Sequence, residues 1–285
     1  MGHVYTGEIR IRHDELDPFG RVHPSSYLRH LAQIAIDASS AAGFDARWYE
    51  AAGARWLVRR TTFELLRAVR AEAELDVRTW VEDFRRVRSR RRYEVTEAHG
   101  ALALTAVTDW VFVDLASGRP RRVPAEMERF GVEVMSGAAR PAWRAPAAPA
   151  NPGRSSYRVR WAELDALGHM NNAAYLDLLI QATLDVLAGL GWPIARLSVD
   201  GAVPLVTGGD VEYLDEVRHD DRLETCTWFT PASHGLDVHQ RTVRLADGRA
   251  VVQANTAWRW TDAVSDALAE PPGGVRSALR PLLAA

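Results

Sequence analysis

The sequence contains an internal repeat with a constant offset of 148 residues. Residues 15–28 read ELDPFGRVHPSSYL and residues 163–176 read ELDALGHMNNAAYL, and the two agree at six of fourteen positions. Two further pairs of blocks keep this offset without a gap and agree at seven of seventeen and four of ten positions: 64–80 with 212–228, and 105–114 with 253–262. One register held over about 100 residues indicates two copies of one fold, related by a pseudo-twofold axis as in a homodimer.

A segment rich in alanine and proline separates the two copies. Thirteen of the eighteen residues in SGAARPAWRAPAAPANPG (136–153) are Ala, Pro or Gly. This composition disfavours a packed helix or strand and is typical of a semi-extended linker. We therefore predict a first domain over 1–135, a linker over 136–153 and a second domain over 154–285.

Both copies predict the same order of elements. A short strand (about 4–12 and 155–162) precedes the polar loop, and a helix (about 25–42 and 173–189) follows it. The rest of each copy is strand-like, with alternation at 75–81 and 223–227 and hairpin turns at AHG (98–100) and ADG (246–248). One helix against one strongly bent antiparallel sheet is an α+β arrangement, which we predict for each domain.

The ends of the two helices carry their own signals. Ser25 and Asn172 are residue types that cap helix N-termini, and we expect them to be the N-caps. Gly43 and Gly191 follow the last periodic residues, where glycine accepts the left-handed conformation that ends a helix.

Composition and charge narrow the classes of function. A net charge of −2 and the absence of a recognisable motif argue against a nucleic-acid partner. No run approaches the roughly 20 apolar residues of a membrane helix, and the N-terminus lacks the apolar core of a secretory signal, so we expect a cytoplasmic protein. The single cysteine, Cys226, and the isolated pair His234 and His239 make no metal-binding pattern, so we expect no metal.

The order of elements and the loop motifs resemble a known family. DPFGRVHPSSY (17–27) resembles the Asp-Pro-x-Gly signature of 4-hydroxybenzoyl-CoA-type thioesterases, and DALGHMNNAAYL (165–176) resembles the Asp-x-x-Gly-His-x-Asn-Asn form of the same superfamily. These enzymes have the hotdog fold, in which a curved antiparallel sheet wraps a central helix. A tandem of two such domains also resembles the acyl-ACP thioesterases of plants and bacteria. The resemblance covers nearly the whole chain outside the linker and the tail.

The resemblance implies hydrolysis of an acyl thioester, carried by CoA or by acyl carrier protein, to free acid and thiol without a metal or redox cofactor. The chain departs from the plant acyl-ACP enzymes at Leu167, where they carry an asparagine two residues before the motif histidine. Their downstream glutamate can be matched to Glu216, at a different spacing from the histidine. In the first copy, Arg21, His23 and Pro24 replace the His-Asn-Asn trio.

Thioester hydrolysis needs a nucleophile or a base, and donors where charge develops on the carbonyl oxygen. Asp165, just ahead of a helix N-terminus, is our candidate base or nucleophile, and the alternative is an Asx-turn residue that shapes the loop. His169 can orient the thioester or the water, and Asn171 can donate to the carbonyl. Asp17 shares the backbone pattern of Asp165, and we keep it as an alternative catalytic residue.

Further residues are candidates for substrate binding. Gly168 and Gly20 let the backbone approach the substrate, and His23 occupies the position of Asn171. Asn172 is a candidate for binding or capping. The arginine-rich segment FRRVRSRRRY (84–93), represented by Arg85 and Arg88, predicts either a clamp for the phosphates of the carrier or a solvated hairpin.

Two other functions stay open. One is a hotdog hydratase or dehydratase that acts on acyl thioesters. The other is a tandem that binds an acyl chain or a carrier without turnover. The sequence also leaves open the acyl chain length, the carrier, whether one or both copies are active, and whether the pseudo-dimer assembles into a homo-oligomer.

Overall fold

The computed structural model describes residues 3–129, 142–199 and 201–284. Contacts divide the chain into two compact units, Met1–Ala142 and Trp143–Ala285. The division falls inside the predicted linker, whose residues 136–141 lie outside the described part. Each unit is a mixed α+β domain, as predicted, and each is described by itself below.

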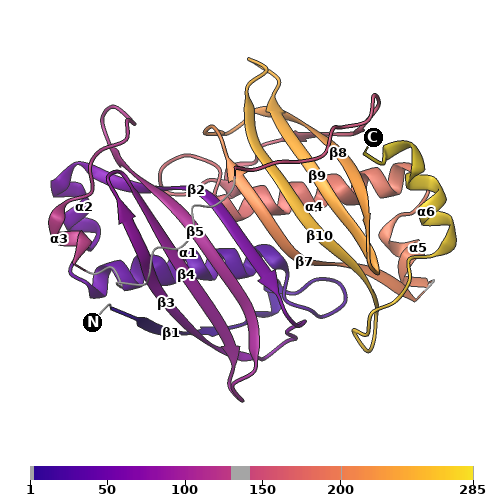
Figure 1. The fold of residues 1–285 in the computed structure, drawn as a ribbon, viewed down its shortest axis with the longest axis horizontal. Helices are drawn as coiled ribbons and strands as arrows, with labels where there is room; N and C mark the ends of the chain where they lie inside the picture. The colour runs from indigo at the N-terminus through magenta and orange to yellow at the C-terminus, as the bar shows by residue number, and fades with distance from the viewer. Residues whose placement is uncertain (1–2, 130–141, 200, 285) are drawn as a thin grey trace. The chain divides into compact units, whose positions relative to one another are not determined.

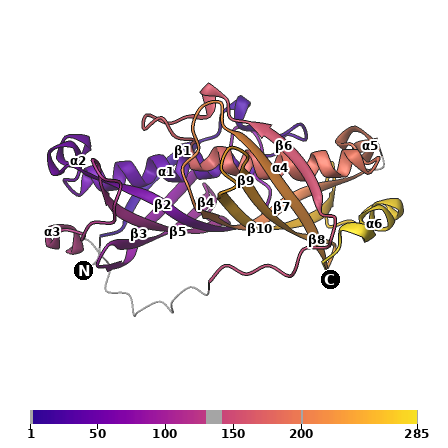
Figure 2. The same cartoon turned by 90° about the horizontal axis from the view of Figure 1, so that it is seen from above.

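The first unit is one antiparallel sheet with a long helix across one face (Figures 1 and 2). Helix α1 has a buried side that packs on the sheet through residues such as Leu31 and Ile34. The strand order in this unit is β1-β3-β4-β5-β2. Its elements are β1 (Tyr5–Arg10), α1 (Pro24–Ala41), α2 (Ala46–Ala52), β2 (Ala54–Leu65), β3 (Glu74–Arg85), β4 (Arg88–Glu97), β5 (Leu102–Asp114) and α3 (Ala125–Glu128), with a 3₁₀ turn at His13–Glu15.

The second unit repeats this arrangement. Its strand order is β6-β8-β9-β10-β7, which is the order of the first unit with each strand replaced by its counterpart. Helix α4 lies across one face of this sheet (Figure 2). The elements are β6 (Gly153–Arg158), α4 (Asn172–Gly189), α5 (Ile194–Val199), β7 (Ala202–Tyr213), β8 (Arg222–Ala232), β9 (Gly235–Arg244), β10 (Ala250–Asp262) and α6 (Gly273–Leu279), with 3₁₀ turns at Trp161–Glu163 and Arg280–Leu282.

The hydrophobic core of each unit lies between the helix and the sheet. The predicted alternation on β3 is confirmed, because every second side chain from Leu75 to Val81 is buried while those between are more exposed. Strand β8 shows the same alternation at Leu223, Thr225 and Thr227. Burial of apolar side chains at about 25 cal/mol per Å² is the main source of stability for such a core.

The helix ends correct one prediction and confirm another. The N-caps are His23 and Asn171 rather than Ser25 and Asn172, because each helix begins before the predicted position. The side chain of His23 accepts from the backbone N–H of Ser25 at 3.4 Å, so an imidazole serves as the cap. Gly43 and Gly191 follow the C-caps with φ values of 91° and 85°, as predicted.

The described end of the predicted linker runs over the second sheet. The Trp228 indole N–H donates to the carbonyl of Pro146 at 3.1 Å, and the Asn255 amide donates to the carbonyl of Arg144 at 2.9 Å. This segment has no helix or strand before Gly153, in agreement with its composition. No helix in the described ranges is long and apolar enough to cross a membrane.

Candidate active site

The loops before α1 and α4 have the same backbone. In the second unit, Asp165 N–H donates to the carbonyl of His169 at 2.8 Å, and Gly168 N–H donates to the carbonyl of Asp165 at 3.0 Å. Asp17 N–H and Gly20 N–H make the corresponding bonds in the first unit, at 2.6 and 3.0 Å. Gly168 and Gly20 have φ values of 74° and 73°, a conformation that favours glycine. The shared residues therefore set the loop shape, and the chemical differences lie in the side chains.

The carboxylates of Asp17 and Asp165 differ in how many hydrogen bonds they accept. Asp17 Oδ1 accepts from the N–H groups of Phe19 and Arg21, and its Oδ2 accepts from the Arg21 guanidinium at 3.0 Å. Asp165 Oδ1 accepts from the N–H of Leu167 at 2.8 Å. Within the described ranges, Asp165 Oδ2 has no hydrogen bond. Both are Asx-turn residues, but Asp165 alone keeps an oxygen without a bond for a ligand or water.

Arg21 explains why both oxygens of the Asp17 carboxylate are already hydrogen-bonded. Its side chain is 2% exposed and replaces His169 of the second loop, and it points at Asp17. A buried guanidinium needs a hydrogen-bonded counter-ion, which Asp17 supplies. The first loop thus uses its carboxylate in a structural ion pair.

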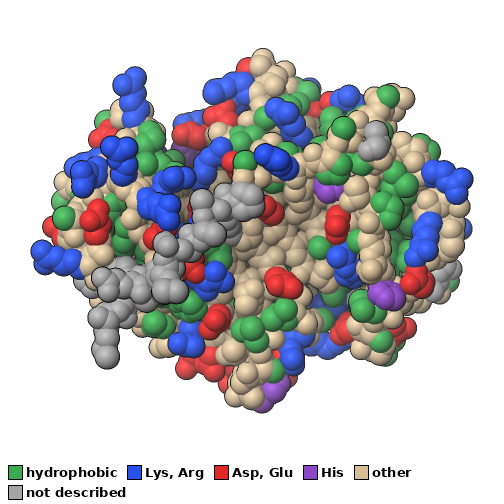
Figure 3. Space-filling view, in the orientation of Figure 1, with side chains coloured by type: hydrophobic (Ala, Val, Ile, Leu, Met, Phe, Trp, Pro, Cys, Tyr) green, Lys and Arg blue, Asp and Glu red, His purple; other side chains and the backbone are tan. Residues whose placement is uncertain are grey.

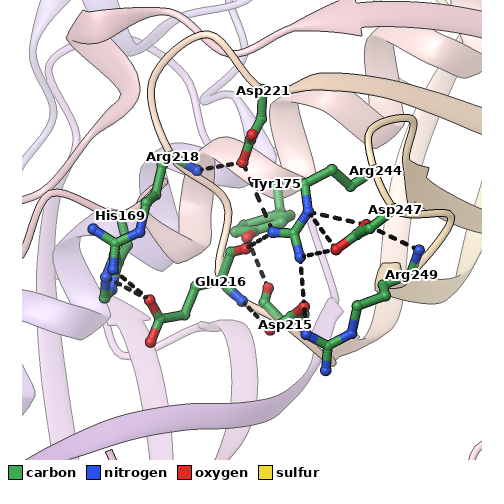
Figure 4. Close-up of polar contacts among 9 residues, drawn as sticks. All are labelled: His169, Tyr175, Asp215, Glu216, Arg218, Asp221, Arg244, Asp247 and Arg249. Atoms are coloured by element: carbon green, nitrogen blue, oxygen red, sulfur yellow. Dashed lines mark hydrogen bonds and ion pairs between the residues drawn. The ribbon is translucent and has the colours of Figure 1, made fainter.

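His169 meets a glutamate from another part of the second unit (Figure 4). His169 Nε2 lies 2.7 Å from Glu216 Oε2, and the His169 side chain is 12% exposed. Arg218 NH2 also contacts Glu216 Oε2, at 3.0 Å. If Nε2 carries the proton that Glu216 accepts, Nδ1 is left as an acceptor, and it makes no hydrogen bond to any described residue.

Arg244 holds the segment that carries Glu216 (Figure 4). Its guanidinium donates to the backbone carbonyl of Glu216 at 2.7 Å and to the carboxylates of Asp215 and Asp247, each at 2.8 Å. Hydrogen bonding to Asp247 and the negative charge around it raise the pKa of Arg244 above its usual range. The hydroxyl of Tyr175 on α4 donates to the carbonyl of Asp215 at 3.3 Å, so the Glu216 segment is tied to the helix as well.

The N-terminus of α4 supplies hydrogen-bond donors. Asn171 Oδ1 accepts from the N–H of Ala173 at 2.9 Å, whereas the Asn171 side-chain NH₂ has no partner among the described residues. Asn172, the first residue of the helix, has an N–H that no intrahelical bond can use. The corresponding residue of α1 is Pro24, which has no N–H. The second helix therefore offers donors that the first lacks.

The predicted binding residues Arg85 and Arg88 lie far from the Asp17 loop. Arg85 and Arg88 face each other across the turn between β3 and β4, and Arg85 pairs with Asp83 at 3.0 Å. This turn is at the far end of β3 from the Asp17 loop, roughly 35 Å along a strand of this length. On the face drawn in Figure 3, basic side chains gather over the first unit.

Glu216, which the sequence matches to the downstream glutamate of the plant enzymes, is not among the residues predicted for the site. It lies 47 residues beyond His169 in the chain, and only folding brings the two together. A comparison of the copies holds a signal for it, because Ala68 stands at the corresponding position of the first copy. No group of three side chains in the described ranges could hold a metal ion.

Comparisons with known proteins agree with the fold. Residues 2–129 match the family model of the acyl-ACP thioesterase N-terminal domain, and residues 159–279 match that of the thioesterase-like superfamily. An acyl-ACP thioesterase structure from Bacteroides thetaiotaomicron superposes with a TM-score of 0.72 at 17% identity, covering 90% of this chain and 98% of that one. A 12:0-ACP thioesterase from Umbellularia californica gives 0.73 at 19% identity, covering 90% and 94%.

The curated relatives that match in sequence are longer than this chain. A chloroplastic acyl-[acyl-carrier-protein] hydrolase from Cuphea viscosissima is 22% identical over 72% of this chain and 48% of its own. A chloroplastic palmitoyl-acyl carrier protein thioesterase from Cuphea hookeriana is 25% identical over 65% and 44%. The matches thus span less than half the length of these relatives. Both halves match thioesterase family models, each over less than half of the chain, and the solved structures share the architecture, so the chain is a tandem of two hotdog domains.

Proposed function

We propose that the chain hydrolyses acyl thioesters, carried by acyl carrier protein or CoA, at the loop before α4. The observation that carries the proposal is the contact of His169 Nε2 with Glu216 Oε2 at 2.7 Å. His169 lies in the same loop as Asp165, whose carboxylate keeps one oxygen without a hydrogen bond to a described residue. The first loop has no equivalent, because Arg21 and Asp17 pair with each other there.

The proposed reaction assigns a role to each group. Asp165 Oδ2 takes a proton from water as the water oxygen bonds to the thioester carbon. The Asn171 side-chain NH₂ and the Asn172 N–H donate to the carbonyl oxygen as it gains charge, at the positive end of the helix dipole. The C–S bond then breaks, and the proton held by Asp165 passes to the departing thiolate.

Glu216 and His169 position the water in this scheme. Glu216 accepts a hydrogen bond from Nε2–H and thereby fixes the tautomer in which Nδ1 accepts a hydrogen bond. His169 Nδ1 is also the second candidate for the base, because a histidine oriented by a carboxylate is a common general base. The side chain that takes the proton is decided by comparing Asp165→Asn with His169→Gln.

The test is thiol release from a series of acyl-CoA and acyl-ACP substrates. Asp165→Asn is expected to keep the fold, measured by circular dichroism, and to lose about 100-fold or more in turnover. His169→Gln with the larger loss would make the histidine the base. Full activity in both variants would overturn the site, and no release from either carrier by the wild type would leave a non-catalytic binding tandem.

Dehydration and hydration are followed in the same samples. A hydratase would add water to a 2-enoyl thioester, which removes the enoyl absorbance without releasing thiol. Hydrolysis also removes the absorbance of the conjugated thioester but releases one thiol for each molecule converted, so thiol release separates the proposed hydrolysis from this alternative.

A further inference from the structure

Arg91 lies on the inner face of the first sheet. It shares that face of β4 with Ser89 and Tyr93, which are buried, and it remains half-buried between them. Its neighbours Arg90 and Arg92 point to the other face of the sheet, and they pair with Asp109 and Glu82. The arginine-rich hairpin therefore sends one guanidinium toward the helix side of the domain.

Among the residues that the structure describes, the Arg91 guanidinium has no carboxylate partner. Its one hydrogen bond to a described residue is donated to the hydroxyl of Thr79, at 3.3 Å. Burial lowers the pKa of Arg91, yet an arginine stays protonated in proteins. Arg21, by contrast, is buried and paired with Asp17. A desolvated charge without a counter-ion is unfavourable, so this position favours an anion.

Two further polar side chains face the same interior from the helices. Ser39 of α1 and Tyr49 of α2 share a hydrogen bond of 2.8 Å between their hydroxyls. The positive charge of Arg91 is close enough to oppose the burial that raises the pKa of Tyr49. We call Ser39, Tyr49, Thr79 and Arg91 the interior polar cluster.

The second copy replaces three residues of this cluster by apolar core and keeps a threonine, Thr227, at the position of Thr79. The counterparts of Ser39, Tyr49 and Arg91 are Leu187, Leu197 and Val238, which are 2%, 0% and 0% exposed. The strand registers support this match, because Arg91 pairs with Val81 and Thr108 where Val238 pairs with Phe229 and Thr256. The fold is thus complete without the polar groups of Ser39, Tyr49 and Arg91, and their presence in the first copy calls for another reason.

The surroundings of the cluster indicate the rest of the ligand. Tyr49 packs with an apolar group of mostly aromatic residues at this end of the domain: Phe44, Trp48, Trp56, Phe84, Phe112 and Met127. The indole N–H of Trp110, on the inner face of β5, is buried, and no described residue accepts a hydrogen bond of good geometry from it. Donors beside an apolar wall suit an acid group on an aliphatic chain.

We propose that the interior polar cluster binds the carboxylate of an aliphatic acid, with Arg91 as the counter-ion. A carboxylate accepts two hydrogen bonds from a guanidinium, and the pair is stronger when desolvated. Two sources share this chemistry: the free acid that the proposed hydrolysis releases, and the distal carboxylate of a dicarboxylic acyl thioester. The choice between these sources rests on the proposed function, whereas the binding itself does not.

The binding test uses calorimetry with decanoate, decanol and sebacate on the full chain. Decanoate is expected to bind at least ten-fold more tightly than decanol. Arg91→Val, which copies the second domain, is expected to lose that preference. Arg78→Val removes an exposed arginine that pairs with Glu94 on the neighbouring strand, and it is expected to bind decanoate like the wild type. Equal binding of acid and alcohol, or an unchanged Arg91→Val, would overturn the proposal.

Two further measurements, thermal melting of the Arg91 variants and thiol release in the presence of decanoate, test the same site. Arg91→Val is expected to melt at the wild-type temperature or above, since it removes an uncompensated charge, and Arg91→Gln serves if the valine variant does not fold. Inhibition of thiol release by decanoate would identify the product as the ligand, and a preference for sebacoyl-CoA over decanoyl-CoA would identify the dicarboxylic substrate. Binding without any thiol release would keep this inference and reject only the proposed function.

Discussion

Glu216 Oε2 lies 2.7 Å from His169 Nε2, and the two residues come from different segments of the second unit. The glutamate carboxylate orients the imidazole, so we expect Glu216→Gln to reduce thioester turnover by about 100-fold while thermal stability stays near that of the wild type. Steady-state thiol release measures the effect. The matched control is Asp220→Asn, which changes an acid in the same segment that pairs with Arg158 instead. Equal losses in the two variants would remove the role of Glu216.

The two loop aspartates should separate stability from activity. Asp17→Asn removes the counter-ion of buried Arg21, and we expect it to lower the free energy of unfolding by about 3 kcal/mol. Asp165→Asn loses no ion pair and should change that free energy by about 0.5 kcal/mol or less. Urea unfolding and thiol release are measured on both variants. A stable Asp17→Asn that has lost turnover would instead make the first copy the active one.

The sequence predicts the architecture well because the repeat and the periodicity are local signals. The order of a strand, a loop, a long helix and further strands in each copy follows from spacing and residue type, as do the helix ends at Gly43 and Gly191. The short helices α2, α3, α5 and α6 are not predicted. The N-caps differ from the prediction because an imidazole at position 23 is an unusual cap, and because Asn171 and Asn172 are equally good cap residues by type. Propensity alone does not choose between neighbours.

The site was less predictable because it depends on contacts distant in the chain. The pairing of His169 with Glu216 requires the end of β7 to meet the loop before α4, which no local pattern reports. The burial of Arg21 is also invisible in sequence, since arginine is an exposed residue by default. The two copies share a fold, so a position at which they differ in chemical type, such as Ala68 and Glu216, indicates a functional rather than a structural role.

A repeated turn gives a pH-dependent contribution to stability. Asp262 is the last residue of β10 as Asp114 is the last residue of β5, and hydrogen bonds from the backbone and hydroxyl of the serine three residues later lower the pKa of each carboxyl. The unfolded chain keeps the ordinary value near pH 4, so it binds the proton more readily than the folded chain. The contribution is therefore present above about pH 4 and is lost as the pH falls through the lowered pKa.

Asp262→Asn tests this sign. We expect it to lower the urea midpoint at pH 7 and to approach the wild type as the pH falls toward 3. Asp14→Asn, at an exposed aspartate of the first 3₁₀ turn, should show no comparable convergence. A deficit in Asp262→Asn that is constant from pH 7 to pH 3 would contradict a role for the carboxylate charge.

Gly235 stands at the start of β9, where the backbone of β10 comes too close for a side chain. A Cβ atom at this position would lie 1.9 Å from the carbonyl oxygen of Trp258 and 2.9 Å from the Cα of Arg259. Both obstacles are backbone atoms, so the hairpin between β8 and β9 would have to move. We expect Gly235→Ala to destabilise the second unit by about 3 kcal/mol or more.

Gly248→Ala is the matched control, because it separates the loss of space from the loss of glycine flexibility. Gly248 lies in the next hairpin turn with open space around it and a φ of 71°, so an alanine there meets backbone strain of about 1 kcal/mol without a clash. Thermal melting of the two variants should therefore show the larger drop for Gly235→Ala. Equal melting temperatures for Gly248→Ala and Gly235→Ala would contradict this argument. The requirement for glycine at position 235 would then come from backbone strain and not from the close approach of β9 and β10.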